Sequence, residues 1–246
     1  MLRFLAGEPL KRRFVAQRSV RFVIAAVLLA VSARFAPQSH SAQTDSITVC
    51  ASECDHETIQ AAIDDTFTDA GDTIQVLDPI HTEAGIVVTK SVSIMGTSTS
   101  GTIVQADTAE GLASDRVFEI PAGVDVTIQD MAIRFGSVTG SPARGGGILN
   151  QGMLKLDRVT IRANHAVGSP GDPGGTAEGG GIYNDGVLQI VSSTISGNEA
   201  RGGGGTPGDD GGHAGGGGLF TTDGGSLTVV SSTVSGNRAR AGAGGG

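Results

Sequence analysis

Aromatic and charged side chains are scarce in this sequence. Its 246 residues include no Trp, one Tyr and eight Phe, and only 17% are charged. Few aromatic rings weaken the case for a sugar-binding groove, because such grooves tend to present aromatic faces to the pyranose ring. An apolar content of 38% nevertheless excludes a disordered chain. The aromatic residues of the repeats are Phe118, Phe135, Tyr183 and Phe220.

No apolar run is long enough for a permanent membrane span. The run from Phe22 to Ala33 covers about 18 Å as a helix, against a hydrocarbon core of about 30 Å. Five basic residues between positions 11 and 21 precede it, and small residues suited to cleavage follow at 31–33 and 40–42. This pattern predicts that residues 1–42 are a signal peptide and leader. The alternatives are an N-terminal membrane anchor and an upstream extension.

Basic residues become few once this leader is set aside. Removing residues 1–42 takes away seven basic residues and one acidic residue, which leaves 10 basic against 24 acidic and a net charge of −14. Such a surface repels nucleic acid and anionic headgroups, whose binding needs Lys or Arg patches. We therefore expect no nucleic-acid partner. The partners compatible with export are extracellular glycans and host or cell-surface proteins.

The sequence has only two cysteines, Cys50 and Cys54. In an exported protein, two cysteines four positions apart predict a local disulfide. A metal site is the alternative, but His56 is the only further ligand nearby. Asp55 is then expected to cap a short helix that carries Ile59 on its apolar face. We predict that residues 43–70 form an N-terminal cap in which this helix covers the end of a β stack.

Glycine is abundant, and it marks an internal repeat. Of 40 glycines, 33 lie at or after Gly136. Each repeat combines a Gly-rich start with period-two alternation of apolar residues, so stacked copies would bury one another's apolar faces. Residues 71–246 are therefore predicted to form an all-β, right-handed parallel β-helix of about seven coils. The clear repeats cover residues 117–136, 145–166, 179–200 and 216–239.

Equivalent residues of the repeats predict columns that run along the stack. One apolar column contains Ile133, Ile161, Ile195 and Val234, and a second contains Val126, Leu154, Leu188 and Leu227. Gly147, Gly181 and Gly218 are expected at tight corners that need positive φ. An Asn recurs at the end of each unit, and such residues can hydrogen-bond to one another between coils. This predicted structural Asn ladder consists of Asn164, Asn198 and Asn237.

Two segments resemble a known group of proteins. Gly-Gly-Gly-Ile-Tyr-Asn at 179–184, followed by Ser-Ser-Thr-Ile-Ser-Gly-Asn at 192–198, resembles the repeats of bacterial surface and polymorphic outer-membrane proteins with a pectate-lyase-like right-handed β-helix. Residues 71–96 are similar to the opening coils of this superfamily. The resemblance covers residues 47–246 and implies an extracellular or cell-surface location. It specifies the fold far better than the function, although many members of the superfamily act on carbohydrates.

An enzyme of this kind needs paired carboxylates, or a base beside a charge-neutralising cation. Asp130 and Asp157 fall at outward positions of adjacent coils, and Arg158 lies beside them. These three residues are the catalytic candidates. The alternative is a surface ion pair between Asp130 and Arg158.

Two insertions share an octapeptide pattern, GSPGDPGG at 168–175 and GTPGDDGG at 205–212. If the coils are in register, both loops leave the stack at the same corner and lie side by side. Asp172, Asp209 and Asp210 would then offer the oxygen ligands that Ca²⁺ prefers. The alternative is ordinary turns, because Gly, Pro and Asp are common turn residues. Ca²⁺ is the only cofactor that the sequence suggests.

The function most compatible with these features is an exported, non-catalytic surface or secreted scaffold, with adhesion as one form of it. The alternatives are a polysaccharide-acting lyase or hydrolase and an inert spacer. Residues 242–246 look like the entry to another unit, so we expect the chain to be part of a longer polypeptide.

Overall fold

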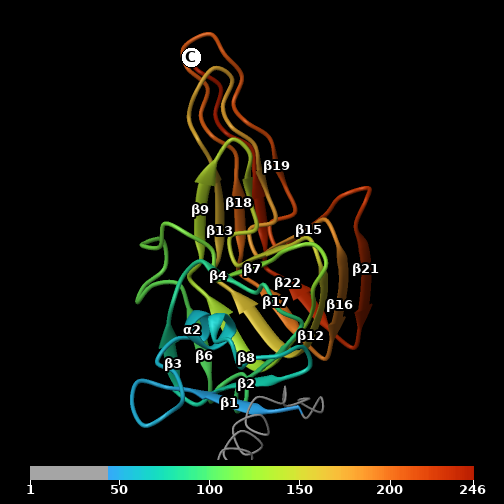
Figure 1. The fold of residues 1–246 in the computed structure, drawn as a ribbon. Helices are drawn as coiled ribbons and strands as arrows, with labels where there is room; N and C mark the ends of the chain where they lie inside the picture. Colours follow the sequence, from blue (N-terminus) through green and yellow to red (C-terminus); the bar gives the residue numbers. More distant parts are fainter. Residues whose placement is uncertain (1–43) are drawn as a thin grey trace, which may run out of the picture. The chain divides into compact units, whose positions relative to one another are not determined.

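The computed structural model describes residues 44–246, so the predicted signal peptide lies outside the described residues. Within this range the chain has one short helix, α2 (Ile59–Asp64), and its other elements are strands. The strands pair in parallel and form four sheets. The prediction of an all-β chain with long parallel sheets is confirmed, and the arrangement is consistent with a β-helix (Figure 1).

The largest sheet, which we call sheet A, has 11 strands. Seven of them follow one another across the sheet in chain order. Four shorter strands pair alongside this path: β3 (Ile80–Thr82), β6 (Ile103–Gln105), β17 (Thr194–Ser196) and β22 (Thr233–Ser235). The path consists of β1 (Ser46–Val49), β2 (Thr73–Val76), β5 (Ser93–Met95), β8 (Asp125–Arg134), β12 (Met153–Arg162), β16 (Val187–Val191) and β21 (Ser226–Val230).

Three smaller sheets complete the fold. From β7 onward the chain visits sheets B, A, C and D in the same order in each coil. Sheet B contains β4 (Ile86–Val87), β7 (Phe118–Ile120), β11 (Ile148–Asn150), β15 (Ile182–Asn184) and β20 (Leu219–Thr221). Sheet C contains β9 (Ser137–Gly140), β13 (His165–Gly168), β18 (Glu199–Arg201) and β23 (Arg238–Arg240). Sheet D contains β10 (Ala143–Arg144), β14 (Ala177–Glu178) and β19 (Ala214–Gly215).

The apolar columns of sheet A have the register that the repeats predict. Ile161 pairs with Ile133 and Ile195, and Ile195 pairs with Val234. The second column, from Val126 through Leu154 and Leu188 to Leu227, is in register as well. Both predicted columns are confirmed. Their side chains are buried in one core from β8 to β17, because each coil covers the apolar face of the next.

The glycine corners differ from the prediction. Positive φ occurs at the first Gly of each Gly-Gly-Gly run, Gly145, Gly179 and Gly216, and not at the third. The third Gly is needed for a different reason. A Cβ on Gly181 would lie 2.5 Å from the Gly218 oxygen and 3.0 Å from the Asn198 Cγ. Gly147 and Gly218 have equivalent close contacts with Asn164 and Asn237.

The helix cap also differs from the prediction. Thr58 is the N-cap of α2, because its side chain accepts a hydrogen bond from the Ala61 amide. Asp55 lies too far before the helix to cap it and instead accepts hydrogen bonds from Thr48. The predicted apolar face is present, since Ile59 and Ile63 are buried in the same core as the strands.

Candidate functional site

The structure brings the three catalytic candidates together on the outer surface of sheet A. Arg158 of β12 reaches Asp130 of β8 through two hydrogen bonds, Nε to Oδ1 at 2.7 Å and Nη2 to Oδ2 at 2.8 Å. Its third guanidinium nitrogen, Nη1, donates to Asp157 Oδ1 at 2.8 Å. One guanidinium therefore holds both carboxylates.

This geometry fixes the charge of the cluster. The hydrogen bonds and charge of Arg158 lower the pKa of Asp130 below its ordinary 3.8, although partial burial opposes the shift. The same hydrogen bonds and the Asp130 charge raise the pKa of Arg158. A general acid needs the opposite, a carboxyl group that keeps its proton near neutral pH. The cluster is therefore an ion-paired network in which Asp130 is not tuned to donate a proton.

A hollow of about 340 Å³ lies beside this cluster. Besides Asp130 and Arg158, its polar lining consists of hydroxyl groups, so it can offer hydrogen bonds to a polar ligand. The hydroxyl residues are Ser98, Thr99, Thr160, Ser192 and Thr194.

A second candidate site is a projection that we call the arm. It consists of residues 137–144, 165–178, 199–215 and 238–246, and it extends from the stack along β9, β13 and β18 (Figure 1). Its two octapeptide loops lie side by side, as the register prediction required: Gly171 bridges Gly205, and the Gly174 amide donates to the Asp210 oxygen.

The arm has two layers, an outbound layer that includes sheet C and a returning layer that includes sheet D. Between the sheets lies a separate small core of Val138, Ala143, Ala166, Ala177 and Ala200. Beyond this core, backbone hydrogen bonds of 2.7 to 2.8 Å cross back and forth between the layers. They run from the amides of Gly175, Gly203, Gly212 and Gly242 to the oxygens of Ser169, Gly175, Gly203 and Gly212, respectively.

Glycine is required where the two layers touch. A Cβ on Gly168 would lie 1.9 Å from the Gly175 oxygen, and one on Gly202 would lie 2.0 Å from the Gly212 oxygen. No side chain fits at such distances, so the backbones themselves form the interior of the outer arm. This packing explains why the insertions are so rich in glycine.

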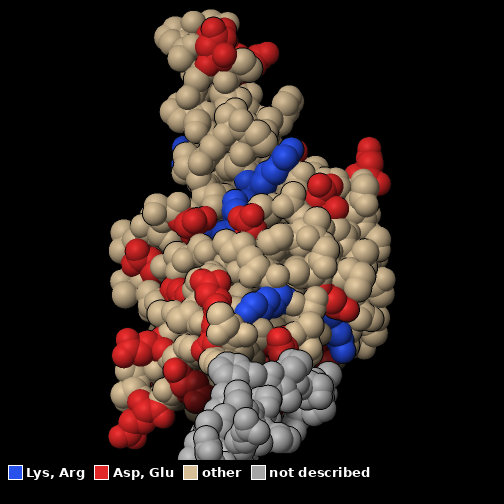
Figure 2. Space-filling model, viewed as in Figure 1, with Lys and Arg blue, Asp and Glu red and all other residues tan. Residues whose placement is uncertain are grey.

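The arm carries acidic side chains at its far end (Figure 2). The Asp209 carboxylate already accepts a hydrogen bond of 2.6 Å from the Thr206 hydroxyl of its own loop. Across residues 44–246, no group of three His, Cys, Asp or Glu side chains is placed to hold a metal ion. The structure therefore does not gather Asp172, Asp209 and Asp210 in the way that the calcium hypothesis requires.

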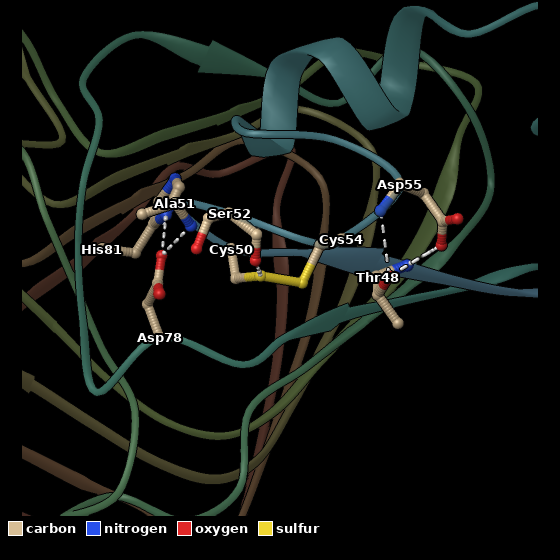
Figure 3. Close-up of a disulfide and its surroundings, with 8 residues drawn as sticks. All are labelled: Thr48, Cys50, Ala51, Ser52, Cys54, Asp55, Asp78 and His81. Carbon is tan, nitrogen blue, oxygen red and sulfur yellow. Dashed lines mark hydrogen bonds and ion pairs between the residues drawn. A yellow bond between two sulfur atoms is a disulfide. The ribbon is translucent and has the colours of Figure 1, made fainter.

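The first strand carries a disulfide-bonded loop on its outer edge. Cys50 and Cys54 form a disulfide, and the loop between them returns the chain alongside β1 (Figure 3). The Cys50 amide donates to the His56 oxygen, and the His56 amide donates to the Thr48 oxygen, both at 3.1 Å. Asp55 accepts hydrogen bonds from the amide and the hydroxyl of Thr48, at 2.8 and 2.7 Å. These two hydrogen bonds from Thr48 lower the pKa of Asp55. The outer backbone edge of β1 is thus occupied at Thr48 and at the following Cys50.

Next to this loop, the sequence interpretation missed a buried His81. Its Nε2 lies 2.8 Å from Glu83 and its Nδ1 lies 3.6 Å from Asp78. Glu83 also accepts from the amides of Ile59 and Gln60 at the start of α2. Asp78 accepts from the Ala51 amide of the disulfide loop (Figure 3). His81 therefore connects the disulfide loop, through Asp78, to the helix, through Glu83. The only signal for this role in the sequence was the spacing Asp-x-x-His-x-Glu.

Two side-chain ladders run through the later coils. Asn164 Nδ2 donates to Asn198 Oδ1, and Asn198 Nδ2 donates to Asn237 Oδ1, both at 2.9 Å. A second ladder was missed in the sequence: the Val159 amide donates to Ser193 Oγ, and the Ser193 amide donates to Ser232 Oγ. The repeated Ser-Ser-Thr at 192–194 and 231–233 was its only signal.

The aromatic side chains pack against each other. Tyr183 and Phe220 are register partners, and their rings stack with centroids 5.7 Å apart. The Arg144 guanidinium lies 4.8 Å from the centroid of the Tyr183 ring. Burial raises the pKa of Tyr183. The ring of Tyr183 is thus enclosed and presents no open face to a sugar.

No helix among residues 44–246 is long and apolar enough to cross a membrane. No protein-family model matches the chain, and no curated protein or solved structure matches it either.

Proposed function

We propose that the four sheets wind as a right-handed parallel β-helix of the pectate-lyase-like kind, and that this β-helix is an exported, non-catalytic scaffold at the cell surface. The repeated order of sheets B, A, C and D supports the winding. Ile59, Ala62 and Ile63 support a capping role for α2, because they pack into the core at the first coils. The basic and apolar pattern of residues 1–42 supports export.

The observation that carries a presenting role is the arm. The two inserted loops are longer than the stack requires. They are hydrogen-bonded to each other and form a two-layer projection. The equivalent connection one repeat earlier, between β9 and β10, has only Ser141 and Pro142, so a repeat closes without a long loop. Extra residues that are built into ordered, exposed structure suit a contact surface.

The partner in this proposal is a glycan or a protein on another cell surface. The acidic end of the arm and the net charge of −14 that remains without residues 1–42 favour a partner with basic groups (Figure 2). We therefore place adhesion at the arm.

The test uses an arm-shortened variant. Residues 169–176 and residues 202–213 are each replaced by Ser-Pro, the connection that β9 and β10 already use. The native chain and this variant are compared for binding to arrays of glycans and to immobilised cell-surface proteins. We expect the variant to keep the native circular dichroism spectrum and to bind at least about tenfold more weakly. Equal binding by the two proteins would remove adhesion from the arm, and binding by neither would favour the inert spacer.

The hollow beside Asp130 and Arg158 favours one second candidate, a polysaccharide-acting lyase or hydrolase. This function is tested by incubating the native chain and the Asp157→Asn variant with pectin and alginate. Unsaturated or reducing ends released by the native chain and lost in the variant would support it.

A further inference from the structure

Two arginines, which we call the arginine pair, lie side by side on the outer face of sheet A. Arg134 ends β8, Arg162 ends β12, and the two are register partners. The preceding residues, Ile133 and Ile161, are buried, so alternation along each strand turns the arginine side chains outward. Register partners on neighbouring strands are about 4.8 Å apart, and arginine stays charged at every physiological pH. The fold therefore sets two like charges in direct opposition, which is unfavourable unless an anion neutralises them.

No carboxylate in the part of the chain that the structure describes forms an ion pair with Arg134 or Arg162. The other basic residues of β8 and β12 do have such a partner. Lys155 lies 3.5 Å and Arg158 lies 2.8 Å from carboxylate oxygens of Asp157. Acidic residues outnumber basic ones by 24 to 10 once the predicted leader is set aside, so carboxylates are plentiful. The arginine pair is thus a local exception in an acidic protein.

The guanidinium of Arg134 is held in place without being neutralised. Gln105 Oε1 accepts from Arg134 Nε at 2.8 Å and from Nη2 at 2.7 Å. Gln105 is only 3% exposed, and its own Nε2 donates to Thr82 Oγ1 at 3.0 Å, so this acceptor is itself fixed. An amide oxygen orients a guanidinium but carries no net charge. Burial and the nearby charge of Arg162 lower the pKa of Arg134.

Phe135 supports the same guanidinium from its face. The Arg134 Cζ lies 4.4 Å from the centroid of the Phe135 ring. Phe135 has a φ of 62°, in the left-handed region that bulky residues rarely adopt. The equivalent residues of the later coils also have positive φ and are small: Ala163, Gly197 and Gly236. A phenylalanine here costs backbone strain that glycine avoids, and it supplies the aromatic surface that positions Arg134.

The surroundings of the arginine pair favour an anionic ligand. Ser196 of β17 is the register partner of Arg162 and faces outward, because the preceding Ile195 is buried. Its hydroxyl adds a hydrogen-bond donor beside the two guanidiniums. At the next corner of the chain, the Glu110 carboxylate is already engaged by His165 Nε2 at 2.8 Å. An anion over the pair would therefore meet donors from three neighbouring strands.

We propose that Arg134, Arg162 and Ser196 form a binding site for a phosphate group. A phosphate group carries close to two negative charges at neutral pH and three acceptor oxygens, so it neutralises both guanidiniums at once. A carboxylate carries one charge and leaves one guanidinium unmatched. The phosphate group belongs either to free inorganic phosphate or to a phosphate ester on a partner. The proposal is independent of what the arm binds.

The test measures binding to the native chain by calorimetry at about pH 7.5, where phosphate is close to doubly charged. The buffer contains about 0.15 M NaCl, so that acidic residues more than about 8 Å away are screened. The ligands are inorganic phosphate, the simple ester phosphoserine, and acetate. The test variant is Arg162→Gln, because this side chain has no ion-pair partner to lose. The matched control is Lys155→Gln, which removes the same charge from the same strand.

We expect phosphate to bind the native chain at least about tenfold more tightly than acetate does, and Arg162→Gln to weaken phosphate binding at least about tenfold. Lys155→Gln should change it by less than about twofold. Without phosphate, Arg162→Gln should unfold at the same temperature as the native chain or at a higher one, because it removes a like-charge contact. With phosphate the order should reverse, since only the native chain gains stability from the ligand.

The two sources of the phosphate group are separated by their affinities. Tighter binding of phosphoserine indicates an ester on a partner, tighter binding of inorganic phosphate indicates the free ion, and both results support the site. Equal binding of acetate and phosphate would overturn the proposal. Equal phosphate binding by the native chain and Arg162→Gln would overturn it too, as would the absence of saturable binding up to about 10 mM phosphate.

Discussion

Arg158 and Asp130 lie on neighbouring coils and are joined through two parallel hydrogen bonds of 2.7 and 2.8 Å. Both residues have positive φ, and Ser192 and Ser231 continue this column of positive φ in the next two coils. The extra residue at this point resets the alternation, so that Ile128 and Met131 both face the core. The ion pair therefore lies at a bend in the backbone, and this bend recurs in every repeat from β8 onward.

The first prediction concerns the pH dependence of this pair. Because its pKa is lowered from 3.8, ionised Asp130 stabilises the fold above pH 3.8, and this contribution is lost as the pH falls through the lowered pKa. Arg158 is half exposed, so Asp130→Asn should cost at most about 1 kcal/mol at pH 7. Urea unfolding of both proteins at pH 7 and near the acid limit checks this. A difference that persists unchanged in acid would contradict it.

The second prediction concerns the Asn ladder. Asn198→Ala removes the acceptor of the Asn164 amide and the donor to the Ile161 oxygen. The amide and the oxygen that lose these partners are both buried. Unsatisfied buried groups make us expect a loss of about 3 kcal/mol in the free energy of unfolding. Asn237→Ala in the half-open last coil is the matched control, for which water can replace the lost partners and about 1 kcal/mol is expected. Equal losses in the two variants would argue against a buried ladder.

The third prediction concerns the interior of the arm. Gly203→Ala places a Cβ 1.9 Å from a backbone oxygen, whereas at the adjacent Gly204 the nearest atom lies at 3.8 Å. We expect Gly203→Ala to open the outer arm and expose the loops to protease, and Gly204→Ala to leave both unchanged. Limited proteolysis followed by mass spectrometry locates the cuts. Equal resistance of the two variants would show that the packed backbone at Gly203 has room for a side chain.

The fourth prediction concerns the disulfide. Replacing Cys50 and Cys54 by Ala should lower the free energy of unfolding by about 2 kcal/mol, the chain-entropy value for so short a loop. It should also loosen the segment that occupies the β1 edge, and exposed edges promote aggregation. Chemical unfolding and light scattering on heating measure the two effects. If neither quantity changes, the hydrogen bonds of Asp55 and His56 hold the edge without the disulfide.

The repeats were enough to predict the stacked columns, because Ile161, Ile195 and Val234 recur at fixed positions and parallel stacking leaves one register. They could not place positive φ, because the first and third Gly of each run look alike in sequence. In the structure all three glycines of the run at 179–181 lack room for a Cβ, and only Gly179 has positive φ. Likewise Asp55 and Thr58 are both plausible caps, and the choice depends on Thr48 lying across from Asp55.

The candidate site was predictable in its membership, and the ion pair between Asp130 and Arg158 was one of two alternatives for its chemistry. Sequence spacing brought Asp130, Asp157 and Arg158 together, but the bidentate geometry that lowers the Asp130 pKa is a property of the bend at positive φ. The octapeptides predicted neighbouring loops, and the backbone contact between the layers became visible only in three dimensions.

The direction of the hydrogen bonds in the arm has a mechanical consequence. They cross between layers whose strands run along the arm, so a sideways force on its far end would shear them together, instead of unzipping them one after another. A projection built in this way behaves as a stiff lever under load, and it transmits force from its tip to the coils that anchor it.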